Sequence, residues 1–206
     1  MKTIIVALTF TLFTATVSAQ DSPSFKLPRA VIKISPLQFV LQTFELGVET
    51  FNKTYSRSFN LSAGVRTGAD YYEKGVGAGV EIGYRKYAAP MKFRSRNNRD
   101  SYQGIYYGLF VKGEYFKGED PYYGSNASDD YSEKILSVST GLTIGFQKTL
   151  WQILLLDVYV GGGYKFSDID VTGYLSQPDW DTDQGIFGPG YTGVYPKMGV
   201  KIGIGL

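Results

Sequence analysis

The stretch Lys134 to Lys148 reads KILSVSTGLTIGFQK and alternates between two kinds of side chain. One set is apolar and the other is small, and they are Leu136, Val138, Leu142, Ile144 and Phe146 against Ser137, Ser139, Gly141, Thr143 and Gly145. Because successive strand side chains point to opposite faces of a sheet, this pattern predicts a strand with two different environments. Repeated glycine packs nothing on a water-facing strand, so the small face indicates a crowded interior. We therefore predict a narrow barrel whose apolar outer wall contacts lipid.

The chain begins with the features of an export signal. Met1-Lys2 precedes an apolar run from Ile4 to Val17, and Val17-Ser18-Ala19 supplies small residues before Gln20. This pattern predicts a signal peptide over 1–19, cleaved after Ala19, and one domain over 20–206. The alternative is a retained N-terminal helix.

Composition is consistent with a membrane barrel. Beyond the signal, no run approaches the roughly 20 apolar residues that a spanning helix needs. The chain has 25 Gly, 17 Tyr and 13 Phe, which are residue types that barrels use inside and at their rims. It has no Cys, so disulfides cannot stabilise it. The net charge of +2 gives no indication of nucleic-acid binding, and none is expected.

The same alternation recurs along the mature chain and predicts an all-β, eight-stranded antiparallel up-and-down transmembrane barrel. The expected strands are 30–41, 44–51, 59–68, 77–87, 104–117, 134–148, 153–166 and 194–206. In the first strand the alternation reverses, so we expect a bulge at Ser35-Pro36 to restore the faces. An even strand count puts both chain ends on the periplasmic side. The expected outer loops are then 42–43, 69–76, 118–133 and 167–193, and the inner turns are 52–58, 88–103 and 149–152.

Charge separates the two ends of the expected barrel. The long outer loops 118–133 and 167–193 carry acids and no base, whereas the basic segment 88–103 and its entry carry six bases. Segment 88–103 is too long for an inner turn, so either it forms an ordered periplasmic excursion or it contains a misplaced strand. The sorting supports the assigned ends, although ordinary solvated loops are the alternative.

The inward positions predict a charge network inside the barrel. Seven bases face five acids there, and they are Lys33, Arg66, Arg85, Lys112, Lys165, Lys197 and Lys201 against Glu45, Glu49, Glu81, Glu114 and Asp157. Charges in such an interior are tolerable when they are paired. An eight-stranded barrel is just wide enough to be filled by its own side chains. We therefore expect a plugged lumen, with a narrow porin-like channel as the alternative.

No catalytic or metal signature stands out. The chain has no His, so the usual general base near neutral pH is missing, and zinc is not expected. Asp179, Asp181 and Asp183 resemble the start of an EF-hand loop, but glycine comes one place late and Gly190 offers no carboxylate at the twelfth position. They are calcium candidates only by this partial match, and a solvated acidic loop is the expectation. The catalytic alternative is a lipid-modifying or proteolytic outer-membrane enzyme, for which loss of an observed activity in Asp181→Asn is the test. No cofactor is expected.

Function is therefore expected in the loops. Aromatic residues in 118–133 and 167–193 lie among Gly, Ser and Asp, a composition suited to surface recognition of an extracellular ligand. The expected protein is a monomeric, non-enzymatic barrel of the bacterial outer membrane with a structural or surface-interaction role. The alternative from another class is a secreted soluble barrel that binds a small apolar ligand, which requires the Leu/Ile/Val face to point inward.

Several segments carry a family resemblance. They are KISPLQFVLQTFELGVE from Lys33, Tyr84-Arg85-Lys86-Tyr87, Gly104-Ile105-Tyr106-Tyr107-Gly108 and the terminal KMGVKIGIGL. With them the chain resembles the small outer-membrane β-barrels of the OmpX/OmpA-transmembrane type, particularly uncharacterised versions from Bacteroidota. The resemblance covers essentially the whole mature chain. It implies assembly by the barrel assembly machinery into outer-membrane lipid, with no defined activity.

Overall fold

The fold was analysed in a computed structural model. It describes residues 28–69, 72–94, 100–120, 131–150, 154–172, 186 and 188–206. The expected signal peptide and the acids Asp179, Asp181 and Asp183 lie outside these residues. None of the helices within the described ranges has the length and apolar character needed to cross a membrane.

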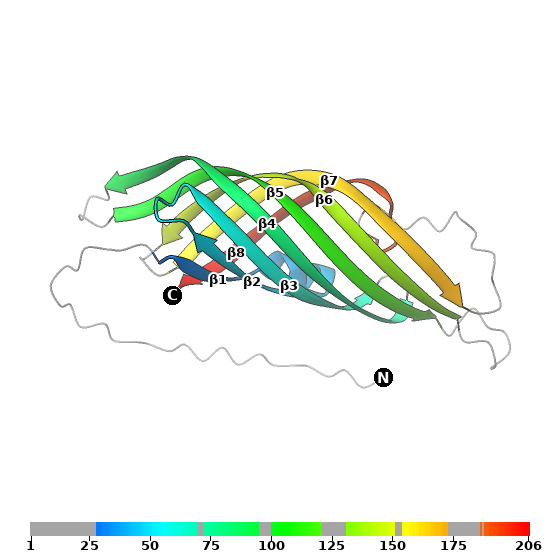
Figure 1. The fold of residues 1–206 in the computed structure, drawn as a ribbon. Helices are drawn as coiled ribbons and strands as arrows, with labels where there is room; N and C mark the ends of the chain where they lie inside the picture. Colours follow the sequence, from blue (N-terminus) through cyan, green and yellow to red (C-terminus); the bar gives the residue numbers. More distant parts are fainter. Residues whose placement is uncertain are drawn as a thin grey trace, which may run out of the picture.

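The described residues form eight strands and one short 3-10 helix (Figure 1). In chain order they are β1 (Ala30–Ile34), η1 (Pro36–Leu41), β2 (Thr43–Phe51), β3 (Arg57–Ala69), β4 (Tyr72–Arg94), β5 (Asp100–Asp120), β6 (Tyr131–Leu150), β7 (Leu154–Thr172) and β8 (Gly193–Gly205). Each strand pairs antiparallel with the next, and β1 pairs with β8. The expected closed, eight-stranded, up-and-down barrel is confirmed.

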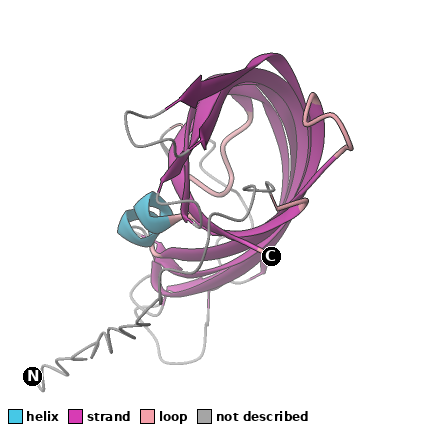
Figure 2. Cartoon of the chain, turned by 90° about the vertical axis from the view of Figure 1, so that its left-hand side faces the viewer, coloured by secondary structure: helices cyan, strands magenta, loops and turns pink. Residues whose placement is uncertain are grey.

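The two faces of the wall follow the sequence alternation. In β6, Leu142 and Ile144 are each 62% exposed, whereas Ser137 and Ser139 are buried. Figure 2 looks along the barrel and shows the strands as a ring around this interior. Its two ends are named here by what lies there: the terminus end holds the start of β1 and the end of β8, and the loop end holds the ends of β3, β5 and β7.

The expected first strand is wrong in its second half. β1 stops at Ile34, and Pro36–Leu41 forms η1, which Figure 2 shows in cyan beside the ring of strands. Pro36 stands in the first turn of η1, where its missing N–H removes no helical hydrogen bond. Gln42 ends the helix in the left-handed conformation, with φ of 53°, and its N–H donates to the carbonyl of Phe39 at 3.0 Å. No bulge is therefore needed at Ser35-Pro36.

The expectation that segment 88–103 is an inner turn is also wrong. Most of it extends β4 to Arg94 and β5 back to Asp100, with Arg94 opposite Asp100 in the ladder. A register shift between Tyr87 and Ala89 marks where this extension begins. Residues 95–99 lie outside the described part of the chain. The described parts of the basic segment are thus paired strands that continue the wall at the terminus end.

Strands also take up parts of the expected outer loops. β5 continues to Asp120 and β6 starts at Tyr131, so only 121–130 of the expected loop 118–133 lies between them. β7 continues to Thr172, and β4 begins at Tyr72 within the expected loop 69–76. One expected loop acid, Glu133, is therefore a buried residue of β6. The alternation of apolar and small residues did not predict these extensions, because the residues that continue the strands are polar and resemble loop sequence.

Candidate functional site

All twelve residues of the expected charge network have limited exposure in the structure. Ion pairs connect eleven of them, whereas Arg66 lies over the ring of Phe116, 5.8 Å from its centroid. The network divides along the barrel axis into a cluster at the terminus end, a middle layer and a partly open region at the loop end.

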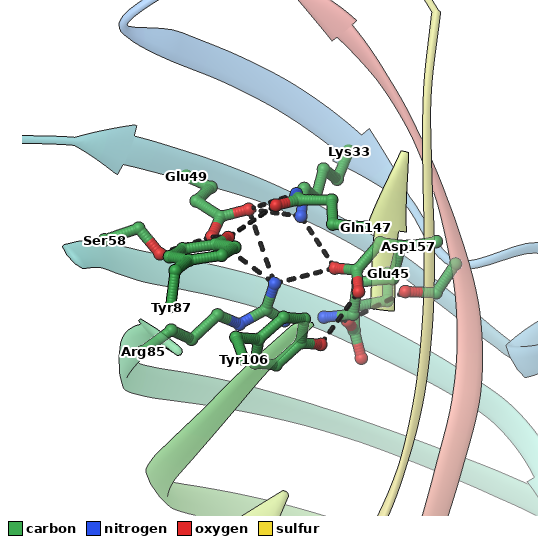
Figure 3. A network of polar contacts seen from close by, with 11 residues as sticks. Lys33, Glu45, Glu49, Ser58, Arg85, Tyr87, Tyr106, Gln147 and Asp157 are labelled. Carbon is green, nitrogen blue, oxygen red and sulfur yellow. Dashed lines mark hydrogen bonds and ion pairs between the residues drawn. The ribbon is translucent and has the colours of Figure 1, made fainter. Parts of the chain in front are cut away.

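The terminus-end cluster is centred on Asp157 of β7 (Figure 3). Its carboxylate accepts hydrogen bonds from Lys33 and Arg85, both at 2.7 Å, and from the hydroxyl of Tyr106 at 2.8 Å. Asp157 and Tyr106 are both 0% exposed. These partners come from β1, β4 and β5, so the cluster joins strands across the whole interior.

Glu49 of β2 is the second acid of this cluster. It forms an ion pair with Lys33 and accepts a hydrogen bond from the amide of Gln147 at 2.9 Å. The hydroxyls of Tyr87 and Ser58 also donate to it. Two acids and two bases therefore meet with their hydrogen bonds satisfied, which is the condition under which buried charges are tolerated.

Sequence reasoning missed the neutral members of this cluster, which are Ser58, Tyr87, Tyr106 and Gln147. Each stands at an inward position of its strand, so strand parity could have found them. The ring of Tyr106 also stacks under the guanidinium of Arg85, 4.3 Å from its centroid. These neutral side chains occupy the space that the ion pairs leave, so that the terminus-end cluster closes the lumen. We call this closure the seal.

The middle layer contains two more ion pairs. Lys201 lies 2.6 Å from Glu45, and Lys197 pairs with Glu81. The ammonium of Lys197 also sits 3.6 Å from the ring centroid of Phe110. A void of about 10 Å³ is found in this layer, which is about the least that holds a single water molecule.

The loop-end half is different because it contains a cavity of about 420 Å³. Lys112 pairs with Glu114 at 2.7 Å, and Lys165 approaches the same carboxylate at 3.7 Å. The cavity also touches small residues of the inward face, among them Ser62, Gly64, Gly77, Gly79 and Ser137. The small face therefore lines a filled interior at one end and an open one at the other.

The five acids of the expected charge network are all engaged by bases. Each of the five is ion-paired with a Lys or Arg side chain. Among the described residues, no three acids converge to hold a metal ion. What the site can do chemically is close the lumen at one end and present positive charge in a cavity at the other.

Comparison of the chain with family models, with curated proteins and with solved structures gives no match.

Proposed function

We propose that this chain is a monomeric, non-enzymatic outer-membrane barrel with a structural or surface-interaction role. The observation that carries the proposal is the distribution of side chains across the wall. Every strand exposes large apolar residues outward, such as Ile32, Leu46, Leu61, Ile82, Leu109, Leu142, Val160 and Met198. Such a continuous outer face is expected where the surrounding medium is hydrocarbon.

The soluble alternative requires the opposite arrangement. A water-soluble barrel that binds an apolar ligand turns its Leu, Ile and Val side chains inward and its charges to water. Here the charges of Lys33, Glu49 and Asp157 are buried inside, and the apolar side chains lie outside. This orientation favours the membrane proposal.

Fractionation tests the location. In cells that export the chain, we expect it in the outer-membrane fraction, extractable only with detergent, and migrating faster on a gel before boiling than after boiling. The shift is expected because a closed barrel resists dodecyl sulfate until it is heated. Free release of the protein into the periplasm or medium without detergent would contradict the proposal.

The interior argues against a conducting pore, which is the channel alternative. Among the described residues, the terminus-end cluster and the middle layer fill the lumen with side chains, and the void found in the middle layer measures about 10 Å³. In a planar bilayer we expect no steady single-channel steps from the wild-type chain. The double variant Tyr87→Ala/Tyr106→Ala removes two rings from the seal and is expected to leak, which makes it the positive control. Regular steps from the wild type would establish the channel instead.

The non-enzymatic part of the proposal has two supports. The chain has no His, and the five acids of the charge network are each paired with a base. We assign the recognition role to the expected loops 118–133 and 167–193, of which 121–130 and 173–192 lie between strands. Both stretches are rich in Asp, Ser, Gly and aromatic residues. Cross-linking of the exported chain through these loops on whole cells is the experiment that identifies a partner.

A further inference from the structure

The loop-end cavity has more positive than negative charge in its lining. The charged residues of its described lining are four bases and three acids, namely Arg66, Lys112, Lys165 and Lys197 with Glu45, Glu81 and Glu114. Glu114 pairs with both Lys112 and Lys165, and Glu45 pairs with Lys201 of the middle layer. The bases of the described lining therefore outnumber the acids that neutralise them, and an anion in the cavity would balance the excess positive charge.

Two buried polar atoms at this cavity lack hydrogen-bond partners among the described residues. One is Nε of Arg66, and the other is Oγ of Ser62, whose residue is 3% exposed. Buried polar groups are costly when they are unsatisfied, so each such atom calls for a partner. Both atoms can donate, and they lie four residues apart on the inward face of β3. Unsatisfied donors in a cavity with more bases than acids fit an anionic group.

The wall beside the cavity is interrupted. β8 pairs with β7 along Gly193–Ile204, but it pairs with β1 only over Ile202–Gly205. Over 193–201, no ladder in the described chain joins the other edge of β8 to a strand, because η1 stands where β1 would continue. Pro196, which has no N–H, lies in this stretch. In hydrocarbon such an unpaired edge is tolerated where protein covers it or where it lines a water-filled cavity, and here η1 and the cavity lie beside it.

The cavity reaches the outer surface at this interruption, which we call the η1–β8 seam. Its lining there is mostly apolar and comes from Leu37, Gln38 and Val40 of η1 and from Pro196 and Met198 of β8. Val40 is 80% exposed and Met198 is 63% exposed. At the loop end, Ile186 and Pro189 contribute to the wall, and Lys165 donates to the carbonyl of Gly188 at 3.2 Å. The seam thus offers a mostly apolar path beside a cationic interior.

We infer that the cavity binds the anionic head group of a single-chain amphiphile, a carboxylate or a phosphate monoester, whose alkyl chain leaves through the η1–β8 seam. A volume of about 420 Å³ lies within the usual range for small-molecule sites. Arg66 binds the head group, and the seam residues contact the chain. The inference rests on the proposed function, because the surrounding bilayer supplies the amphiphile.

Calorimetric titration of the full chain in phosphatidylcholine nanodiscs tests the binding. Dodecanoate and dodecyl phosphate are expected to bind saturably, one per barrel, and the tighter of the two identifies the head group. Inorganic phosphate has the head without the chain, and dodecanol has the chain without the charge. Both are expected to bind at least about tenfold more weakly, since each forgoes one class of contact.

Variants locate the site. Arg66→Gln is expected to weaken dodecanoate binding about tenfold, because a charge-assisted contact is lost. Arg57→Gln makes the same change at an exposed position of β3 and is the matched control. Equal effects of the two variants, or equal binding of dodecanol and dodecanoate, would overturn the inference. So would equal binding of inorganic phosphate.

The seam is tested by closing it. Because the chain has no Cys, Val40→Cys/Met198→Cys can be joined selectively by a short cleavable linker. We expect about tenfold slower association of dodecanoate, restored when the linker is cleaved. An unchanged rate would show entry from the loop end and refute the path. If the chain fractionates with the outer membrane but binds no amphiphile, only this inference fails. If it binds amphiphiles but is released as a soluble protein, the proposed location fails.

Discussion

Asp157 is the residue on which the terminus-end cluster depends most. It is fully buried and holds Lys33, Arg85 and Tyr106 from three other strands. Removing one partner of a buried ion pair is costly because the remaining charge stays in a poorly solvating interior. The cluster therefore stabilises the barrel only while both of its acids stay ionised.

Asp157→Asn is expected to lower the free energy of unfolding by about 3–5 kcal/mol, because it leaves two cations to share Glu49. The measurement is urea unfolding in lipid vesicles, followed by the loss of the heat-modifiable gel band. Asp168→Asn makes the same change at an exposed position of the same strand and is expected to have little effect. Similar losses in both variants would mean that the cluster does not stabilise the fold.

At the residue scale, the sequence predicted which side chains point into the barrel better than it predicted which of them form ion pairs with each other. Strand parity placed Lys33 and Asp157 inside, because alternation is a local property. Their contact joins residues 124 positions apart, and no local pattern encodes which inward charges meet across a barrel. The cavity was also missed, since glycines on an inward face indicate only that space is limited or available, and the structure shows both cases.

At the scale of strands, glycine sets how closely β6 and β7 approach. Gly141 stands opposite Gly163, and Thr143 stands opposite Gly161. A Cβ added at Gly161 would overlap the carbonyl oxygen of Leu142, which is backbone and cannot turn aside. By contrast, a Cβ at Gly113 of β5 would meet nothing within 4 Å.

Gly161→Ala is therefore expected to destabilise the barrel by about 1–3 kcal/mol through strand separation, whereas Gly113→Ala is expected to be near neutral. Urea unfolding in vesicles compares the two variants directly. If Gly161→Ala leaves the free energy of unfolding unchanged, β6 and β7 can separate enough to admit the methyl group, which contradicts the close packing inferred here.

Two elements departed from the sequence prediction for identifiable reasons. In Pro36–Leu41, apolar residues at every second position fit a strand as well as the 3-10 helix that forms, so alternation could not distinguish them. The extension of β4 and β5 through segment 88–103 carries many charges and a proline, which are typical of turns. Backbone pairing in the hairpin holds this segment as strand despite its composition.

At the scale of the whole molecule, the apolar outer face of the barrel is the basis for proposing that lipid surrounds it. A continuous apolar belt surrounds an interior of ion pairs, which inverts the order of a water-soluble protein. This inversion could be predicted from the stretch 134–148, because its two faces differ so strongly in size and polarity. The seam could not, since it depends on β1 ending after five residues.

A single probe on this belt tests directly whether the barrel wall lies in lipid. Leu142→Cys, labelled with an environment-sensitive dye, is compared in vesicles with Asp168→Cys, which lies toward the loop end of β7. We predict that brominated acyl chains quench the dye at position 142 and that aqueous iodide quenches the dye at position 168. Quenching at position 142 by iodide, with no effect of the brominated lipid, would contradict a membrane-spanning wall.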